Sequence, residues 1–66
     1  MTYEECGKVV DAVRPLLKGT GYDINYDLGG EIYFTLEGDV VEFYELPLAT
    51  QIKVYFAALN KLDIRF

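Results

Sequence analysis

Few residues in this sequence could take part in catalysis. The chain has one cysteine, Cys6, and no histidine, so the commonest proton shuttle of enzymes is absent. Cys6 falls near the start of an expected helix, a position that can activate a thiol, but no base stands near it in the sequence. It also shares an apolar stripe with Val9, Val10 and Val13. We therefore expect a buried structural cysteine and no catalytic residue.

Metal and phosphate sites lack their signatures as well. A single cysteine without histidine excludes an internal disulfide and a multi-cysteine zinc site. Gly29-Gly30 is not followed by the lysine and hydroxyl residue of a phosphate-binding loop, and no EF-hand spacing is present. Paired carboxylates can hydrolyse glycosides, but 66 residues leave little room for a substrate cleft. We expect no metal, no cofactor and no enzymatic activity.

The length and charge of the chain limit its class. Sixty-six residues, 52% of them hydrophobic, are expected to form a single domain over residues 1–66 with one core. The lone thiol and the absence of a secretory leader favour the cytoplasm, and no apolar stretch approaches a membrane span. The net charge of −5 opposes direct binding to nucleic acid or anionic lipid and favours a basic partner. The alternative is that the acidity only keeps a small protein soluble.

A helix is predicted near the N-terminus. Thr2 followed by Glu5 fits a capping box, in which a hydroxyl and a carboxylate satisfy free backbone N–H groups. Pro15 cannot donate a backbone hydrogen bond and should kink or shorten the last turn, so the helix is expected to end near residue 17. Gly19 suits a left-handed cap. The apolar face of this helix comprises Cys6, Val9, Val10, Val13, Leu16 and Leu17.

From Tyr22 the apolar residues alternate, which predicts two half-buried strands. A strict two-residue Gly29-Gly30 turn would mix carboxylates with apolar side chains on both faces, so we consider it unfavourable. A three-residue loop over residues 28–30, with a glycine in the left-handed conformation, makes one face wholly apolar. The register expected from this loop pairs Tyr26 with Ile32, Ile24 with Phe34, and Tyr22 with Leu36.

A second hairpin and a second helix are expected to follow. Gly38-Asp39 suits a tight turn. Pro47 then ends the third strand and starts a helix whose apolar stripe should face the core. The strand pairs expected are Leu36 with Val41 and Phe34 with Phe43, and the helical stripe is Leu48, Ile52, Tyr55, Phe56, Leu59 and Leu62.

These elements predict an α+β fold in the order α-β-β-β-α. The two apolar helix stripes and the apolar face of a three-stranded antiparallel meander must bury one another, which places both helices on one face of the sheet. Residues 63–66 alternate like a strand, and two interpretations remain open for them. They form either a short edge strand or an end that is pinned by Phe66.

The other face of the sheet is expected to be acidic. No lysine or arginine occurs from Gly19 to Gln51, so no cation is expected to interrupt this face. Alternate residues of a strand are about 6.6 Å apart, which gives a ladder of carboxylates a spacing of the same order as DNA phosphates. Like charges placed so close destabilise a sheet by a few tenths of a kcal/mol per pair, which suggests that the arrangement is used. The seven acids of this run are Asp23, Asp27, Glu31, Glu37, Asp39, Glu42 and Glu45.

Two tyrosines are expected among these acids. Tyr33 and Tyr44 should face each other across the second and third strands, and aromatic residues set among charges are common interface anchors. Asn25 and Thr35 belong to the same face. The alternative is a solvated face, with tyrosines present for β propensity and acids for solubility. The candidate partner-binding residues are Asp23, Asp27, Glu31, Tyr33, Glu37, Glu42 and Tyr44.

In its size, expected fold, lack of catalytic residues and acidic run, the chain resembles the small phage-encoded anti-CRISPR proteins that mimic DNA. The resemblance implies that carboxylates take the place of phosphates and block the surface on which a Cas effector binds the protospacer-adjacent motif and duplex DNA. The resemblance implies a type I surveillance complex or Cas9 as the target, of which we favour the type I complex. The resemblance implies phosphate mimicry by Asp23, Asp27, Glu31, Glu37 and Glu42, with contact area from Tyr33 and Tyr44.

Two other functions remain open. The first is a phage or bacterial adaptor that binds a protein partner through Tyr33, Tyr44 and Val40, with the acids as a polar rim. Salt separates it from DNA mimicry, because an electrostatic interface weakens steeply with ionic strength. The second is self-association through a strand edge, at residues 22–28 or 64–66. The expected oligomeric state is a monomer or a weak homodimer.

Overall fold

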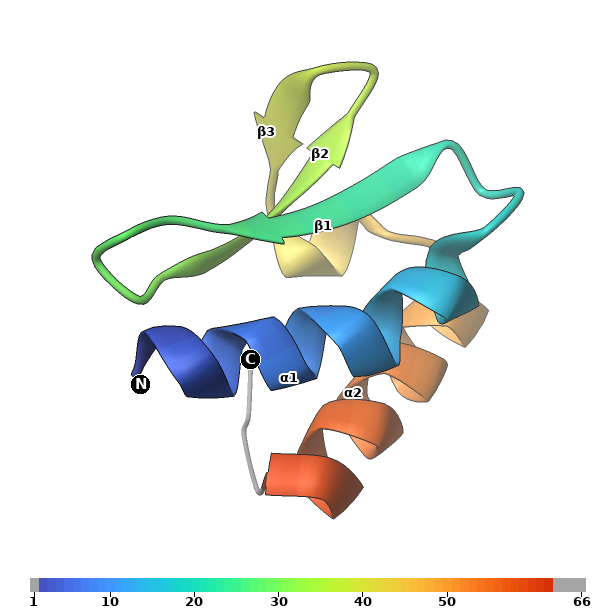
Figure 1. The fold of residues 1–66 in the computed structure, drawn as a ribbon. Helices are drawn as coiled ribbons and strands as arrows, with labels where there is room; N and C mark the ends of the chain where they lie inside the picture. The colour runs from blue at the N-terminus through green and yellow to red at the C-terminus, as the bar shows by residue number, and fades with distance from the viewer. Residues whose placement is uncertain (1, 63–66) are drawn as a thin grey trace.

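The structure is a computed structural model that describes residues 2–62, with side chains described for residues 2–59. Its elements confirm the predicted α+β fold (Figure 1). Residues 63–66, for which two interpretations were left open, lie outside the described residues. The elements are α1 (Tyr3–Val13), a 3₁₀ helix η1 (Arg14–Leu17), β1 (Tyr22–Tyr26), β2 (Ile32–Leu36), β3 (Asp39–Val41), a 3₁₀ helix η2 (Phe43–Glu45) and α2 (Leu48–Leu62).

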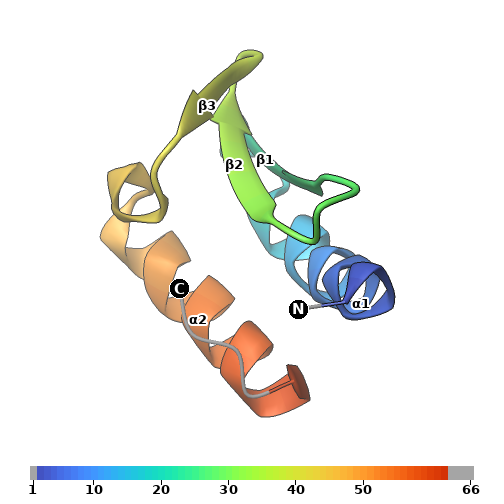
Figure 2. The ribbon, with the colours of Figure 1, turned by 90° about the vertical axis from the view of Figure 1, so that its left-hand side faces the viewer.

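Both helices lie on the same side of the antiparallel sheet, which has the strand order β1-β2-β3 (Figures 1 and 2). Helix α1 runs beneath β1 and contacts both the sheet and α2. The main contacts of α2 are with α1 and the two 3₁₀ helices. The hairpin of β2 and β3 projects away from the helices, and its turn is the part of the sheet farthest from them (Figure 1).

The predicted ends of the first helix are confirmed. The Glu5 backbone N–H donates to Thr2 Oγ1 at 3.1 Å, and the Thr2 N–H donates to Glu5 Oε1 at 2.9 Å. These hydrogen bonds from Thr2 hold the pKa of the Glu5 carboxyl below its usual value. At the other end Pro15 coincides with a change from α to 3₁₀ geometry, as expected of a residue without an N–H. Gly19 then has a φ of 83°.

The predicted register of β1 and β2 is also confirmed. Ile24 is paired with Phe34, and these two side chains are buried on the apolar face. The Asp27 N–H donates to the Glu31 carbonyl oxygen at 3.0 Å, which leaves the predicted three-residue loop over residues 28–30, and Gly30 takes the left-handed conformation with a φ of 83°. The remaining apolar pairs are Tyr22 with Leu36 and Tyr26 with Ile32.

The predicted register of the second hairpin is wrong by two residues. Phe34 is paired with Val41 and not with Phe43, because the turn consists of Glu37 and Gly38. Both turn residues have positive φ angles, 52° and 90°, which is the turn geometry that matches the twist of a hairpin. A shift of two residues leaves every side chain on its predicted face. It also ends β3 at Val41, so the chain turns into η2 where a longer strand is predicted.

The sheet and the two helices share one hydrophobic core. Phe34 packs on Phe43 with ring centroids 5.7 Å apart and a 52° angle between the planes. Helix α1 and η1 together contribute the predicted apolar face, except that Leu16 of η1 is only half-buried. The buried hydrophobic cluster is Val9, Val10, Val13, Leu17, Ile24, Phe34, Leu46, Val54 and Ala58.

The prediction that the large apolar stripe of the second helix faces the core is wrong. Helix α2 turns its smaller residues inward instead, with Thr50, Val54 and Ala58 buried. Small side chains allow two helix backbones to approach closely, which favours this face at the contact with α1. Gln51 fixes the same orientation, because its Nε2 donates to the carbonyl oxygens of Leu46 at 2.7 Å and of Tyr44 at 3.0 Å. Of the predicted stripe, Leu48, Ile52 and Phe56 are exposed and Tyr55 and Leu59 are half-buried, while the side chain of Leu62 lies outside those that the structure describes.

Ile24 is the residue whose truncation should cost most stability in the sheet. Its side chain is fully buried, so Ile24→Ala should lower the free energy of unfolding by about 2–5 kcal/mol through lost burial and a residual cavity. The matched control is Val40→Ala, also in the sheet, where the side chain is 71% exposed and the change should stay within about 0.5 kcal/mol. Urea unfolding followed by circular dichroism measures both, and equal midpoints for the two variants would contradict the described core.

Candidate functional site

The outward face of the sheet carries the polar side chains that the register predicts. Asp23 is paired with Thr35, and Asn25 with Tyr33, so these four alternate with the buried Ile24–Phe34 pair. Asp23 is exposed, whereas Tyr33 and Thr35 are half-buried. The face therefore combines one carboxylate, one amide, a hydroxyl and a phenol over β1 and β2.

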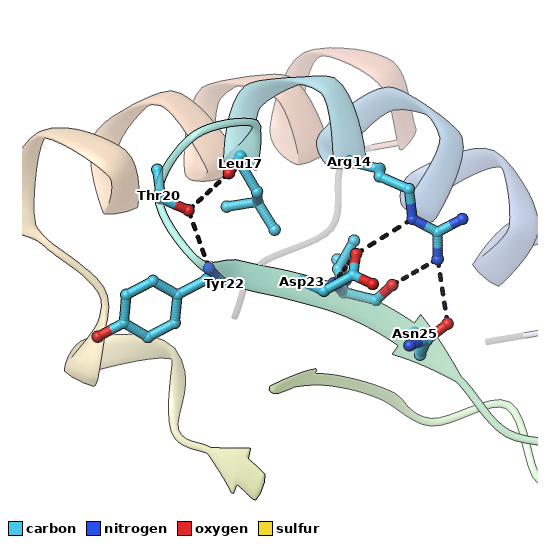
Figure 3. A network of polar contacts seen from close by, with 7 residues as sticks. Arg14, Leu17, Thr20, Tyr22, Asp23 and Asn25 are labelled. Carbon is cyan, nitrogen blue, oxygen red and sulfur yellow. Dashed lines mark hydrogen bonds and ion pairs between the residues drawn. The ribbon is translucent and has the colours of Figure 1, made fainter. Parts of the chain in front are cut away.

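The prediction that no cation interrupts this face is wrong. Arg14 reaches over β1 from η1, and its Nε lies 3.2 Å from Asp23 Oδ1 (Figure 3). Its Nη2 donates to the carbonyl oxygen of Ile24 at 2.7 Å and to Asn25 Oδ1 at 3.0 Å. The planar guanidinium, with several donors in a fixed fork, suits such simultaneous contacts. Asp23 is therefore a partly neutralised carboxylate and the weakest candidate for binding a basic partner.

Arg14 also covers the free edge of β1. The Asp27 N–H donates to the Glu31 carbonyl oxygen at 3.0 Å, so these two residues are a hydrogen-bonded pair of the ladder. Hydrogen-bonded and non-hydrogen-bonded pairs alternate along antiparallel strands, so the N–H and C=O of Ile24 point away from β2. The Ile24 carbonyl oxygen accepts a hydrogen bond from Arg14, and the Ile24 N–H donates to Asp23 Oδ1 at 2.8 Å. Edge groups that already have partners offer little to an incoming strand. This arrangement argues against the addition of a strand at Ile24, near the middle of the edge formed by residues 22–28.

Thr20 protects the beginning of the same edge. The Tyr22 N–H donates to Thr20 Oγ1 at 3.1 Å, and Thr20 Oγ1 donates to the Leu17 carbonyl oxygen at 2.6 Å (Figure 3). Side chains thus form hydrogen bonds with the outward backbone groups of both Tyr22 and Ile24. The hydroxyl of Thr20 links this edge to the end of η1.

Three of the other acids have local structural roles while remaining exposed. Asp27 Oδ1 accepts from the Glu31 N–H at 3.0 Å and closes the first hairpin loop. Glu42 and Glu45 form a reciprocal capping box around η2, with the Glu42 N–H donating to Glu45 Oε2 at 2.6 Å. Accepting hydrogen bonds from the backbone leaves a carboxylate charged, so these residues still contribute to the negative field.

Glu31, Glu37 and Asp39 are the remaining acids of the run, and all three are exposed. Glu37 and Asp39 lie at the turn between β2 and β3, on the projecting hairpin (Figure 1). Within residues 2–59 the structure shows a single ion pair, that of Arg14 with Asp23. The six acids of the run other than Asp23 therefore have no ion-pair partner among the described side chains, and two of them lie at this turn.

The prediction that Tyr33 and Tyr44 face each other across two strands is wrong. Tyr44 belongs to η2, where its side chain is 73% exposed, and Glu42 is the N-cap of the same 3₁₀ helix. Both positions fall beyond the end of β3. The structure thus brings Asp23 and Tyr33 onto one face, while it places Glu42 and Tyr44 on a separate segment. Val40, paired with Thr35, takes the outward position on β3.

Sequence reasoning missed Arg14 because it searched for cations only within residues 19–51. The signal that could have found it is its position directly before Pro15, at the end of a helix that must return over the first strand. A depression of about 580 Å³ lies beside it, lined by residues that include Asp11, Lys18 and Tyr22. The Arg14 guanidinium at this depression is already engaged with Asp23, Asn25 and the backbone.

The expected structural role of Cys6 agrees with its surroundings. Its side chain is fully buried, and its Sγ lies 3.2 Å from the Gly30 carbonyl oxygen as a hydrogen-bond donor. Among the residues that the structure describes, no three cysteine or acidic side chains are grouped so that they could hold a metal ion. No described helix is long and apolar enough to cross a membrane.

Comparison of the chain with protein-family models, with curated proteins and with solved structures finds no match. The geometry of the surface is therefore the basis for any functional proposal.

Arg14→Lys tests whether the guanidinium holds the edge of β1. Lysine carries the same charge but cannot bridge Asp23, Asn25 and the Ile24 carbonyl with one planar group, so the free energy of unfolding should fall by about 1 kcal/mol. Lys18→Gln is the control, because Lys18 is an exposed cation next to η1 and should change stability by less than about 0.5 kcal/mol. Chemical denaturation measures both, and a wild-type midpoint for Arg14→Lys would argue against the bridge.

Proposed function

We propose that this chain is a non-catalytic acidic protein that binds a basic, DNA-binding protein or complex. The observation that carries the proposal is the distribution of charge. Residues 19–51 contain seven acids and no lysine or arginine, all seven acids are exposed, and Asp23 alone among them has an ion-pair partner within residues 2–59. A surface of one sign raises the association rate with a surface of the opposite sign.

The specific form that we favour is an anti-CRISPR inhibitor. In this form the carboxylates occupy the surface on which a Cas effector, preferably a type I surveillance complex, binds the motif and duplex DNA. The projecting hairpin supports the idea, since its acidic turn stands clear of the helices and could enter a basic groove (Figure 1). The inhibitor would act in the cytoplasm of the bacterial host cell and bind no nucleic acid itself.

The backbone at Glu37 gives further support. Its φ of 52° lies in the left-handed region, which costs a residue with a long side chain more than it costs asparagine, aspartate or glycine. Asn-Gly is the sequence most favoured in such a turn, yet the chain has Glu-Gly. Residues in strained backbone conformations are often found at functional sites. The long side chain of Glu37 would carry its carboxylate out from the hairpin tip toward the basic groups of a partner.

Glu37→Asn and Glu37→Asp form a matched pair that separates stability from binding. Both residues tolerate the left-handed conformation better than glutamate, so each should raise the free energy of unfolding by about 0.5–1 kcal/mol. Only Glu37→Asn removes the charge, and it should weaken binding to a purified type I surveillance complex by about tenfold, as expected for one charge-assisted contact. Calorimetry and surface plasmon resonance measure the two effects. Equal affinities for the two variants would exclude a role for the Glu37 charge.

Competition with DNA tests the inhibitory mechanism. The protein should displace a labelled duplex carrying the protospacer-adjacent motif from the surveillance complex. Its affinity should fall at least about tenfold between about 50 and 200 mM salt, because exposed charges would dominate the interface. The control for location of the charge is Glu4→Gln with Asp11→Asn. It removes two exposed acids from α1, outside the acidic run, and should leave displacement of the duplex nearly unchanged. Binding that leaves the duplex in place would contradict DNA mimicry on this target.

A second candidate is an adaptor that binds a protein partner through exposed apolar side chains. Val40 and Tyr44 favour it, because they are 71% and 73% exposed and lie on adjacent segments, β3 and η2. Large exposed aromatic residues are frequent anchors of interfaces. An adaptor of this kind would keep its affinity in high salt and lose it in Tyr44→Ala, a pattern opposite to that of the acidic mimic.

A further inference from the structure

The outward face of α2 is an apolar stripe that stays exposed among the side chains of residues 2–59. Leu48, Ile52 and Phe56 follow one another at intervals of four residues, and they are 71%, 50% and 55% exposed. The half-buried Tyr55 and Leu59 border the same stripe. The opposite face of α2 is also apolar and packs in the core, so the helix is hydrophobic on both sides. Helices with this pattern are normally buried all round.

The size of the stripe is appropriate for a contact with another polypeptide. Half or more of each of these three large side chains is accessible, which corresponds to roughly 300 Å² of apolar surface. Apolar patches of this size on small soluble proteins are often functional. The area is below the roughly 800 Å² per partner of a standard interface, so the contact should be weak and depend on concentration.

The stripe is complementary to itself. Side chains spaced by four residues form a ridge, and the ridges of two helices interdigitate at a crossing angle of about −50°, the commonest class in globular proteins. If two copies of α2 cross at Ile52, Leu48 of each copy meets Phe56 of the other, so the smaller side chain lies against the larger one. Such mutual contacts are those of a two-fold interface. We propose that two copies of this chain associate through the exposed stripe of α2, about a two-fold axis close to Ile52.

The distribution of charge favours a second copy at this place. Helix α2 contains no aspartate or glutamate, whereas the sheet and its loops carry seven acids. Association through α2 therefore keeps the strongly negative parts of both copies away from the contact. Lys53 follows Ile52 by one residue, which turns it about 100° from the stripe and places its ammonium at the rim. The acidic hairpin projects from the opposite layer and remains free in the dimer (Figures 1 and 2).

Sedimentation over about a hundredfold range of protein concentration tests the association, since the dimer fraction must rise with concentration. Ile52→Lys should raise the dissociation constant at least about tenfold, because it places two ammonium groups at the centre of the contact. Val40→Lys is the matched control, an equally large change at an exposed apolar residue of the sheet, and it should leave the dimer intact. Circular dichroism verifies that both variants are folded.

Cysteine cross-linking tests the symmetry separately. The native Cys6 is fully buried, so Ile52→Cys adds the accessible thiol. Oxidation should link two copies through position 52, whereas Phe56→Cys alone should link poorly and should link well when mixed with Leu48→Cys. A chain that stays monomeric at every concentration would overturn the proposal, as would a dimer that resists Ile52→Lys. Loss of the dimer in Ile52→Lys without cross-linking at position 52 would overturn the two-fold arrangement.

Discussion

The fold depends on the packing of α1 against both the sheet and α2. Val9 and Val13 are fully buried and Val10 nearly so, because α1 packs against the sheet and α2 at the same time. These β-branched side chains have few rotamers and lose little conformational entropy when they are packed. With so small a chain, no second core could compensate for a loss of this contact. The position of every surface group described above follows from it, since α1 fixes where the sheet and α2 lie.

The end of α1 connects this core to the outer surface. Pro15 changes the helix to 3₁₀ geometry, and the preceding Arg14 is then directed over β1. Its contacts join η1 to the side chains of Asp23 and Asn25 and to the backbone between them. A residue of the helical layer therefore determines both the charge of the first strand and the accessibility of its edge. The unpaired acids of the run therefore lie beyond the part of β1 that Arg14 contacts, at the two hairpin loops and around η2.

Much of the fold could be predicted from the sequence because several signals are local. The capping box at Thr2 and the register of β1 and β2 follow from residues that are near neighbours along the chain. The second register could not be chosen in this way, since turns at residues 37–38 and 38–39 keep the same side chains on each face and the actual one requires a strained Glu37. The role of Arg14 and the inward face of α2 depend on tertiary packing, which no periodicity reveals.

The arrangement of the two helices also has a consequence for the order in which the fold forms. Each hairpin closes a small loop, an event that takes about 1–10 μs in isolated hairpins. The contact between α1 and α2 instead joins segments from opposite ends of the described chain, so it closes a longer loop and carries a larger closure entropy than either hairpin. Contacts of such large sequence separation slow the folding of small domains. The search of α2 for α1 is therefore the step that should limit the folding rate of this protein.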